Sequence, residues 1–233
     1  MPSADTAMIK LEGVAKTFVM HLRSATLPVL RQVSFEVHAG ECVVLDGPSG
    51  SGKSSILKMI FGNYRADAGR ILVCDGRAWV DVARAPPREI LRLRRSVLGY
   101  VSQFLRTIPR VGALDVVAAS AGTCGLEAPT ARTRAAELLA RLAIPERLWQ
   151  LPPATFSGGE QQRVNIARGL VATHPVLLLD EPTASLDRDN RAVVVDCIRQ
   201  RKRSGAALVG IFHDEDVKRQ VADRAIDVSC FRA

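Results

Sequence analysis

The sequence predicts an α/β protein built around a parallel sheet, and three observations support this prediction. Glu41–Asp46 contains an unbroken apolar run, which is typical of a strand covered on both faces. Val176–Asp180 and Ala207–Phe212 are two further apolar strands, and each follows a segment with helical periodicity. Strands separated by helices of this length pair in parallel through crossover connections.

The first third of the chain consists mainly of predicted strands and turns. Apolar residues alternate over Met8–Val14 and over Val29–His38, and the second of these strands ends at the turn Ala39-Gly40. The buried strand Glu41–Asp46 leads into a glycine-rich loop, which is followed by the helical pattern of Ser54–Phe61. This part of the chain therefore contains a strand, a loop and a helix in direct succession.

The remaining elements are predominantly helical in pattern. The middle third, from about Ser96 to Pro153, is predicted to be a helical insertion into the α/β core. It contains the predicted helices Ala113–Ala121 and Ala131–Leu142. The last third contains the predicted helices Glu160–Ala172, Arg191–Arg203 and Glu215–Ala222, followed by a short closing strand. We expect one domain over residues 1–233, with residues 1–95 and 154–233 as the catalytic core and 96–153 as a helical subdomain.

The composition is that of an ordinary globular protein, with 233 residues of which 47% are hydrophobic, and a formal net charge of +8. The longest uncharged apolar runs, Val176–Leu179 and Ala206–Phe212, are shorter than the roughly 20 residues of a membrane-spanning helix. The first residues show no secretory signal. The five cysteines lack any CxxC pair, which favours free thiols in a reducing compartment. We therefore expect a cytoplasmic protein with no transmembrane segment.

The strongest chemical signal is a GxxxxGK[ST] motif between the predicted strand Glu41–Asp46 and the helix that follows it. In such a P-loop, backbone N–H groups and a helix N-terminus surround a phosphate, the lysine reaches the β and γ phosphates, and the hydroxyl binds Mg²⁺. Because the sequence matches every position of the motif, a chance glycine-rich turn is a poor alternative explanation. We expect ATP binding by Gly47, Pro48, Ser49, Gly50, Ser51, Gly52, Lys53, Ser54 and Ser55.

Two carboxylates follow the apolar strand Val176–Leu179. Because the carboxyl ends of parallel strands meet at the ligand-binding edge of a sheet, Asp180 is expected to hold Mg²⁺ and Glu181 to polarise the attacking water. The alternative is a pair of solvated acids at a strand end.

A second candidate phosphate site lies at the start of the helix after Phe156. Ser157 and Glu160 have the spacing of a capping box, which by itself explains both residues. It does not explain Gly158 and Gly159, which weaken a helix relative to alanine but leave its backbone N–H groups uncovered. One chain with two phosphate sites suggests that two chains enclose the nucleotide between them.

Three single residues complete the predicted site. Gln103 follows a short strand and is expected to contact the metal or the water, although an isolated glutamine is usually a polar surface residue. His213 ends the strand that runs towards the same edge as Asp180, and is expected to hydrogen-bond a γ-phosphate. Phe18 is expected to stack on adenine, with a purely structural role as the alternative.

Taken together, these motifs resemble those of ATP-binding-cassette (ABC) ATPases over essentially the whole chain. The matching segments are Walker A (Gly47–Ser54), the Q-loop (Gln103), the signature (Phe156–Glu160), Walker B (Val176–Glu181), the D-loop (Ser185–Asp187) and the H-loop (His213). The resemblance implies a P-loop NTPase fold with a RecA-like core, an antiparallel β subdomain and an inserted helical subdomain. It also implies ATP and Mg²⁺, with two cassettes, identical or paralogous, sandwiching two nucleotides. Phe156 and Glu160 depart from the usual leucine and glutamine.

Within this family, the sequence resembles the PhnL-type ATPases of the bacterial carbon–phosphorus lyase system. The similar segments include Val101–Arg106, Ile108–Arg110, Pro145–Trp149, Thr155–Asn165 and Gly210–Glu215. This resemblance implies soluble phosphonate-processing partners and a part in forming ribose 1-phosphonate 5-triphosphate from ATP. The alternative is the nucleotide-binding subunit of a membrane transporter of the lipoprotein-release or export type. Either partner is expected to dock on the apolar and basic segment Phe104–Val111. Nucleic acid is not an expected partner, although Arg84–Arg110 is rich in arginine.

Overall fold

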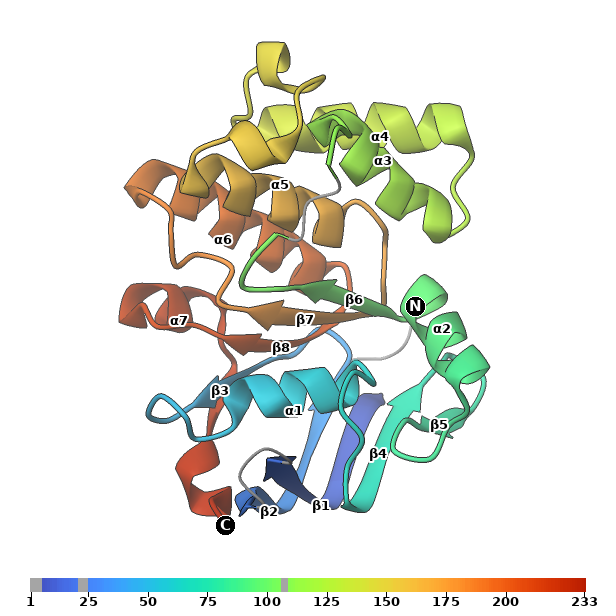
Figure 1. Cartoon of the computed structure of the whole chain (residues 1–233), viewed down its shortest axis with the longest axis vertical. Coiled ribbons are helices and arrows are strands. Elements are labelled where there is room, and N and C mark those ends of the chain that lie inside the picture. Colours follow the sequence, from blue (N-terminus) through green and yellow to red (C-terminus); the bar gives the residue numbers. More distant parts are fainter. Residues whose placement is uncertain (1–5, 21–24, 106–108) are drawn as a thin grey trace.

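Figure 1 shows the computed structural model, which describes residues 6–20, 25–105 and 109–233. The molecule consists of an antiparallel sheet, a parallel sheet flanked by helices, and a group of helices stacked on the far side of the parallel sheet. The predicted α/β class, with an antiparallel part and a helical part, is confirmed. The predicted absence of a secretory signal concerns residues 1–6, of which 1–5 lie outside the described part.

The antiparallel sheet has the strand order β2–β1–β4–β5. The long strands β1 (Ala7–Met20) and β2 (Ala25–His38) pair with each other through several irregularities. Strands β4 (Ala68–Cys74) and β5 (Trp79–Asp81) complete the sheet. The two long strands extend beyond their predicted bounds, since the register shifts interrupt the simple alternation of apolar residues on which the prediction relied.

The parallel sheet has the order β6–β7–β8–β3–β9. All its neighbouring strands pair in parallel, so their carboxyl ends lie at one edge. The strands are β3 (Cys42–Asp46), β6 (Leu98–Val101), β7 (Val176–Asp180), β8 (Ala207–Ile211) and β9 (Arg224–Asp227). The predicted boundary of the helical segment at residue 96 is therefore wrong, because β6 belongs to the core sheet.

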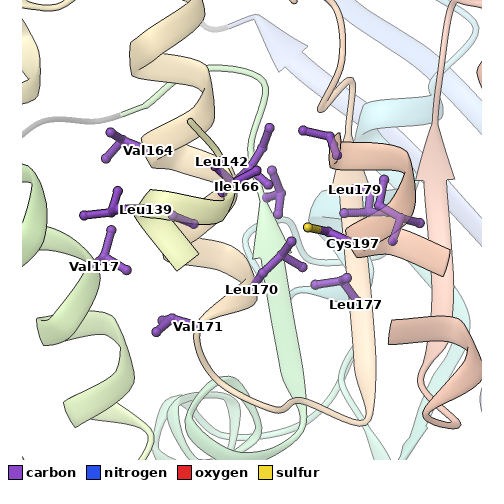
Figure 2. Close-up of a cluster of buried hydrophobic side chains, with 14 of the residues drawn as sticks. Val117, Leu139, Leu142, Val164, Ile166, Leu170, Val171, Leu177, Leu179 and Cys197 are labelled. Carbon is purple, nitrogen blue, oxygen red and sulfur yellow. The ribbon is translucent and has the colours of Figure 1, made fainter. Parts of the chain in front are cut away.

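Two apolar clusters lie on opposite faces of the parallel sheet. Helix α1 (Lys53–Ile60) buries its apolar side chains between the two sheets. The other face packs against α5 (Gly158–Leu170) and α6 (Arg188–Arg203), and α3 (Ala113–Thr123) and α4 (Ala128–Arg141) pack outside α5. Figure 2 shows the second cluster, in which Val117 and Leu139 of the outer helices lie on the same side of α5 as Val164. Leu177 and Leu179 of β7 contribute from the sheet.

Two of the helices that begin earlier than predicted have starts fixed by capping residues. Ser157 caps α5, which begins at Gly158 rather than Glu160, and Asp187 accepts a hydrogen bond from the Asn190 N–H, so that α6 begins at Arg188 rather than Arg191. The remaining elements are α2 (Pro87–Ser96), α7 (Glu215–Val221) and the 3₁₀ turns η2 (Glu146–Leu148), η3 (Pro153–Thr155) and η4 (Val228–Phe231).

Part of the arginine-rich segment Arg84–Arg110 forms α2, and the charges of this helix are partly balanced within the chain. Arg92 donates to Asp75 over 2.8 Å and to Glu89 over 2.6 Å. Arg94 donates to the Phe61 carbonyl and to the Asn63 side chain. Both arginines therefore have intramolecular roles. The predicted docking segment Phe104–Val111 includes residues 106–108, which lie outside the described residues; Phe104 itself is 72% exposed.

Candidate nucleotide-binding site

The predicted phosphate loop connects β3 to α1 at the carboxyl edge of the parallel sheet. Gly47, Gly50 and Gly52 all have positive φ angles, of 124°, 80° and 102°. At Gly52 a side chain would also place its Cβ only 2.8 Å from Leu30 Cδ2, so the close approach of the loop to β2 requires glycine there. At Gly50 a Cβ would meet nothing within 4 Å, which shows that this part of the loop faces open space.

Lys53 folds back over the loop that precedes it. Its Nζ donates to the carbonyls of Gly47 and Pro48, over 2.6 and 2.8 Å, and the residue is only 8% exposed. The Ser51 hydroxyl is also buried and has no hydrogen-bond partner among the described residues. A buried ammonium group and an unsatisfied hydroxyl on one curved loop are the features expected of an anion cradle.

Asp180 ends β7 beside the start of α1. It is 3% exposed, and each of its carboxylate oxygens accepts one hydrogen bond: Oδ1 from Ser54 Oγ over 3.0 Å and Oδ2 from the Tyr100 hydroxyl over 2.9 Å. Burial and the negative charge of Asp180 raise the pKa of Tyr100, so that the phenol remains a hydrogen-bond donor. Two of the predicted metal ligands, Ser54 and Asp180, therefore lie in contact.

Glu181 follows Asp180 in the left-handed backbone region, with a φ of 51°. Its Oε1 accepts a hydrogen bond from His213 Nε2 over 2.7 Å, and its Oε2 accepts one from Gln103 Nε2 over 3.1 Å. Three residues predicted separately from the sequence thus meet at one carboxylate. Gln103 was also expected to bind the metal. In this structure its side chain contacts Glu181.

Glu181 and His213 border a pocket of about 390 Å³. Phe18 of β1 and Leu27 and Val29 of β2 contribute apolar side chains to its lining, and Glu181 and His213 contribute polar ones. The phosphate-loop residues that line it are Ser49, Gly50, Gly52, Lys53, Ser54 and Ser55. The Phe18 ring is held by an edge-on contact with Tyr64, with centroids 5.2 Å apart. An aromatic ring beside a phosphate loop is suitably placed for contact with a purine.

The second predicted phosphate site lies at the N-terminus of α5, and none of its residues is among those that line the pocket in the described part of the chain. Ser157 and Glu160 form a complete capping box: the Glu160 N–H donates to Ser157 Oγ over 3.3 Å, and the Ser157 N–H to Glu160 Oε2 over 2.9 Å. Hydrogen bonds from Ser157 lower the pKa of Glu160. A Cβ at Gly158 would meet nothing within 4 Å, so this helix start is open on that side.

Three residues that hold the site together were not predicted from the sequence. Tyr100 contacts Asp180, and its only sequence signal is its place on the strand before Gln103. Lys218 of α7 donates to Asp46 over 2.9 Å, a contact that lowers the pKa of this acid at the start of the loop. Gln162 of α5 donates to the Pro182 carbonyl over 3.1 Å. Contacts between residues so far apart in the chain leave no periodic signal.

Comparison with known proteins assigns a family to this arrangement. Residues 30–184 match the family model described as "ABC transporter". The chain belongs to the ABC transporter family. The cassette is 40% identical over 211 residues to the lipoprotein-releasing system ATP-binding protein LolD of Maricaulis maris, and the match covers 90% of this chain and 89% of the relative.

Two further comparisons describe the relatives of the cassette. It is 34% identical over 223 residues to the macrolide export ATP-binding/permease protein MacB of Salmonella choleraesuis, of which it spans only 33%. The dimeric structure of the ATP-binding cassette MJ0796 in a post-hydrolysis state with ADP and phosphate has a TM-score of 0.85 and 29% identity, with 95% of both chains covered. No helix among the described residues has the length and apolar character needed to cross a bilayer.

ABC ATPase domains bind ATP with Mg²⁺, and the residues of this cassette fit both. Mg²⁺ prefers oxygen ligands and is commonly held by one or two protein groups together with phosphate and water. The Ser54 hydroxyl and the Asp180 carboxylate provide such a pair beside the phosphate loop. No cluster of three or more His, Cys, Asp or Glu residues suited to a metal occurs in the described ranges.

Proposed function

We propose that this ABC cassette binds ATP and hydrolyses it as one half of a pair of cassettes. The observation that carries the proposal is the meeting of Ser54 with Asp180, and of Glu181 with His213 and Gln103, around the pocket at the phosphate loop. A carboxylate beside a buried lysine and a metal-binding pair is the arrangement that phosphoryl transfer to water requires.

The proposed roles follow from the contacts. Lys53 leaves the carbonyls of Gly47 and Pro48 and donates to the β and γ phosphates. Ser54 and Asp180 hold Mg²⁺, with Gln103 as a further ligand or as a contact to the water. The metal, when bound, supplies positive charge that offsets the negative charge developing on the phosphoryl group.

Glu181 is proposed to orient and deprotonate the attacking water. Each of its carboxylate oxygens accepts one hydrogen bond in this structure, from His213 or from Gln103, and keeps a further lone pair that can accept a water. A γ-phosphate offers His213 an alternative acceptor. Transfer of the His213 hydrogen bond to the phosphate would make the Glu181 carboxylate more basic, and the Gln103 segment would relay the change to a partner.

The pair of cassettes is proposed from the separation of the two phosphate sites. Ser157, Gly158, Gly159 and Glu160 contact the nucleotide in trans, across an interface with a second copy or a paralogue. The backbone N–H groups and positive dipole at the start of α5 suit a phosphate. Since the Glu160 side chain is engaged by Ser157 in the capping box, its charge is directed into the helix start.

Binding of ATP is tested by calorimetry on the purified protein, in which magnesium ATP should release or absorb heat in the wild type but not in Lys53→Ala. Lys58→Ala is the matched control, because Lys58 lies on the same helix over the Tyr64 ring and does not line the pocket. Absence of nucleotide binding by the wild type, alone and with any second cassette, would refute the proposed function.

The first candidate for the wider assembly is a membrane transporter of the lipoprotein-release or export type. The observation that favours it is the 40% identity to LolD over nearly the full length of both chains. The exposed Phe104, next to the Q-loop, provides an apolar contact for a permease. In this role, closure and opening of the cassette pair would move a membrane partner.

The second candidate is the carbon–phosphorus lyase system, with formation of ribose 1-phosphonate 5-triphosphate. It is supported by the Phe156 and Glu160 signature and by the resemblance of Thr155–Asn165 and Gly210–Glu215 to PhnL-type ATPases. The relatives found by comparison are transporter ATPases and add no support for it. Affinity purification of the tagged chain from cells grown on a phosphonate distinguishes the candidates: soluble phosphonate enzymes would favour the second, and an integral membrane permease the first.

A further inference from the structure

The Asp180 carboxylate is held from two sides. Ser54 of α1 donates to one oxygen over 3.0 Å, and Tyr100 of β6 donates to the other over 2.9 Å. The χ2 angle of an aspartate, which sets the orientation of its carboxylate, is only weakly restricted. A single hydrogen bond would therefore leave the orientation of the Asp180 group poorly defined, whereas two donors on different elements fix it.

Tyr100 is itself firmly positioned. Its backbone pairs with Leu178 in the parallel sheet, two residues before Asp180 on β7. Its ring stacks on Phe61 at the end of α1, with centroids 4.9 Å apart and an angle of 28° between the planes. The Phe61 carbonyl accepts a hydrogen bond from Arg94 Nε over 3.0 Å, and the Arg94 guanidinium lies 4.5 Å from the Phe61 ring centre.

We propose that Tyr100 is a positioning residue for the metal site: its hydroxyl holds Asp180 Oδ2 so that Oδ1 stays directed towards Ser54. This proposal rests on the proposed function, in which Ser54 and Asp180 are the protein ligands of Mg²⁺. Groups that hydrogen-bond to a metal ligand set its orientation, and their loss commonly weakens metal binding by about tenfold or more. Tyr100 is such a group, since it hydrogen-bonds to a metal ligand without itself contacting the nucleotide.

A purely structural tyrosine would behave differently. Tyr100→Phe keeps the ring and its stacking on Phe61 and removes only the hydroxyl. If the hydroxyl served stability alone, the variant would unfold at lower denaturant concentration, but its use of the metal in nucleotide binding would not change. The metal-dependent part of the affinity therefore separates the two roles.

The experiment measures binding of the non-hydrolysable analogue AMP-PNP by calorimetry, once with MgCl₂ and once with EDTA. The ratio of the two dissociation constants is the gain in affinity that the metal provides. Tyr100→Phe should reduce this gain by about three- to tenfold while leaving the EDTA affinity unchanged. Tyr64→Phe is the matched control, since the chain has only two tyrosines and this variant also loses a single phenolic hydroxyl; its gain should equal that of the wild type.

A double variant shows whether Tyr100 acts through Asp180. Asp180→Ala lowers the metal-dependent gain, and adding Tyr100→Phe to it should cause no further loss. Three results would overturn this inference without touching the proposed function. They are an unchanged gain in Tyr100→Phe, an equal loss in Tyr64→Phe, and an additional loss in the double variant. A wild type that binds no AMP-PNP would overturn the proposed function and this inference with it.

Discussion

His213 Nε2 donates a hydrogen bond to Glu181 Oε1 over 2.7 Å, joining the ends of two adjacent parallel strands. The histidine side chain is 57% exposed, whereas Glu181 is 16% exposed. Gln103 donates to the other oxygen of the carboxylate, so each oxygen of the proposed base accepts one hydrogen bond and keeps a lone pair for a water. Loss of either donor on the arrival of ATP would make the carboxylate of the proposed base more basic.

The first prediction concerns Glu181 as the proposed base. Glu181→Gln keeps the size and the hydrogen-bonding capacity of the side chain but cannot accept a proton. We expect the ATPase rate, measured as phosphate release, to fall by about 10²- to 10⁴-fold, while ATP binding persists and a closed pair of cassettes accumulates on gel filtration. Glu146→Gln, at an exposed 3₁₀ turn, should hydrolyse ATP as the wild type does. Undiminished phosphate release in Glu181→Gln would remove Glu181 from the mechanism.

The second prediction concerns the capping box at the start of α5. Glu160→Ala removes the acceptor of the Ser157 N–H, and should lower the free energy of unfolding by about 1 kcal/mol. Glu160→Gln can still accept this bond and should lose less. Urea denaturation measures both values. Equal stability of the alanine and glutamine variants would show that the box contributes little.

The third prediction concerns the contact between α5 and β6. A Cβ at Gly169 would overlap the Val101 side chain and lie 3.3 Å from the Tyr100 carbonyl. Gly169→Ala should therefore lower the free energy of unfolding by about 1–3 kcal/mol. Gly122→Ala is the matched control, because a Cβ at this helical glycine of α3 would meet nothing within 4 Å; it should stabilise the protein by up to about 1 kcal/mol. Chemical denaturation of both variants tests the contrast, which a stable Gly169→Ala would contradict.

The fourth prediction concerns pH and the buried His174, which is 7% exposed. Burial, with a smaller contribution from the charge of Arg201, lowers the pKa of His174 to about 4 from an ordinary value near 6.5. Between these pH values the unfolded chain binds a proton at His174 that the folded chain excludes, so the free energy of unfolding falls as the pH falls through this window.

Between pH 7 and pH 5 this one group should lower the free energy of unfolding by about 2 kcal/mol. His174→Gln cannot titrate, and should lose correspondingly less stability over the same interval. Urea denaturation of both proteins at the two pH values gives the comparison. Equal losses in the wild type and the variant would mean that His174 is not responsible for the pH dependence.

The sequence predicted the core of the site because its signals are local. The phosphate loop and the apolar strand before Asp180 and Glu181 each occupy a short continuous segment, and the parallel arrangement brings them to one edge. Strands β4 and β5 were not predicted: β4 contains two exposed residues and a positive-φ glycine at its start, and β5 has only three residues. Tyr100 and Lys218 could not be predicted, since each acts through a single contact with a residue far away in the chain.

The left-handed backbone of Glu181 places hydrolysis in competition with resistance to heat. A residue with a side chain is strained at a φ of 51°, and glycine would relieve about 1 kcal/mol of that strain. Selection for thermal tolerance alone would act against this strained position, although replacing Glu181 would remove the proposed catalytic base. Any such selection on this chain has to include a screen for released phosphate.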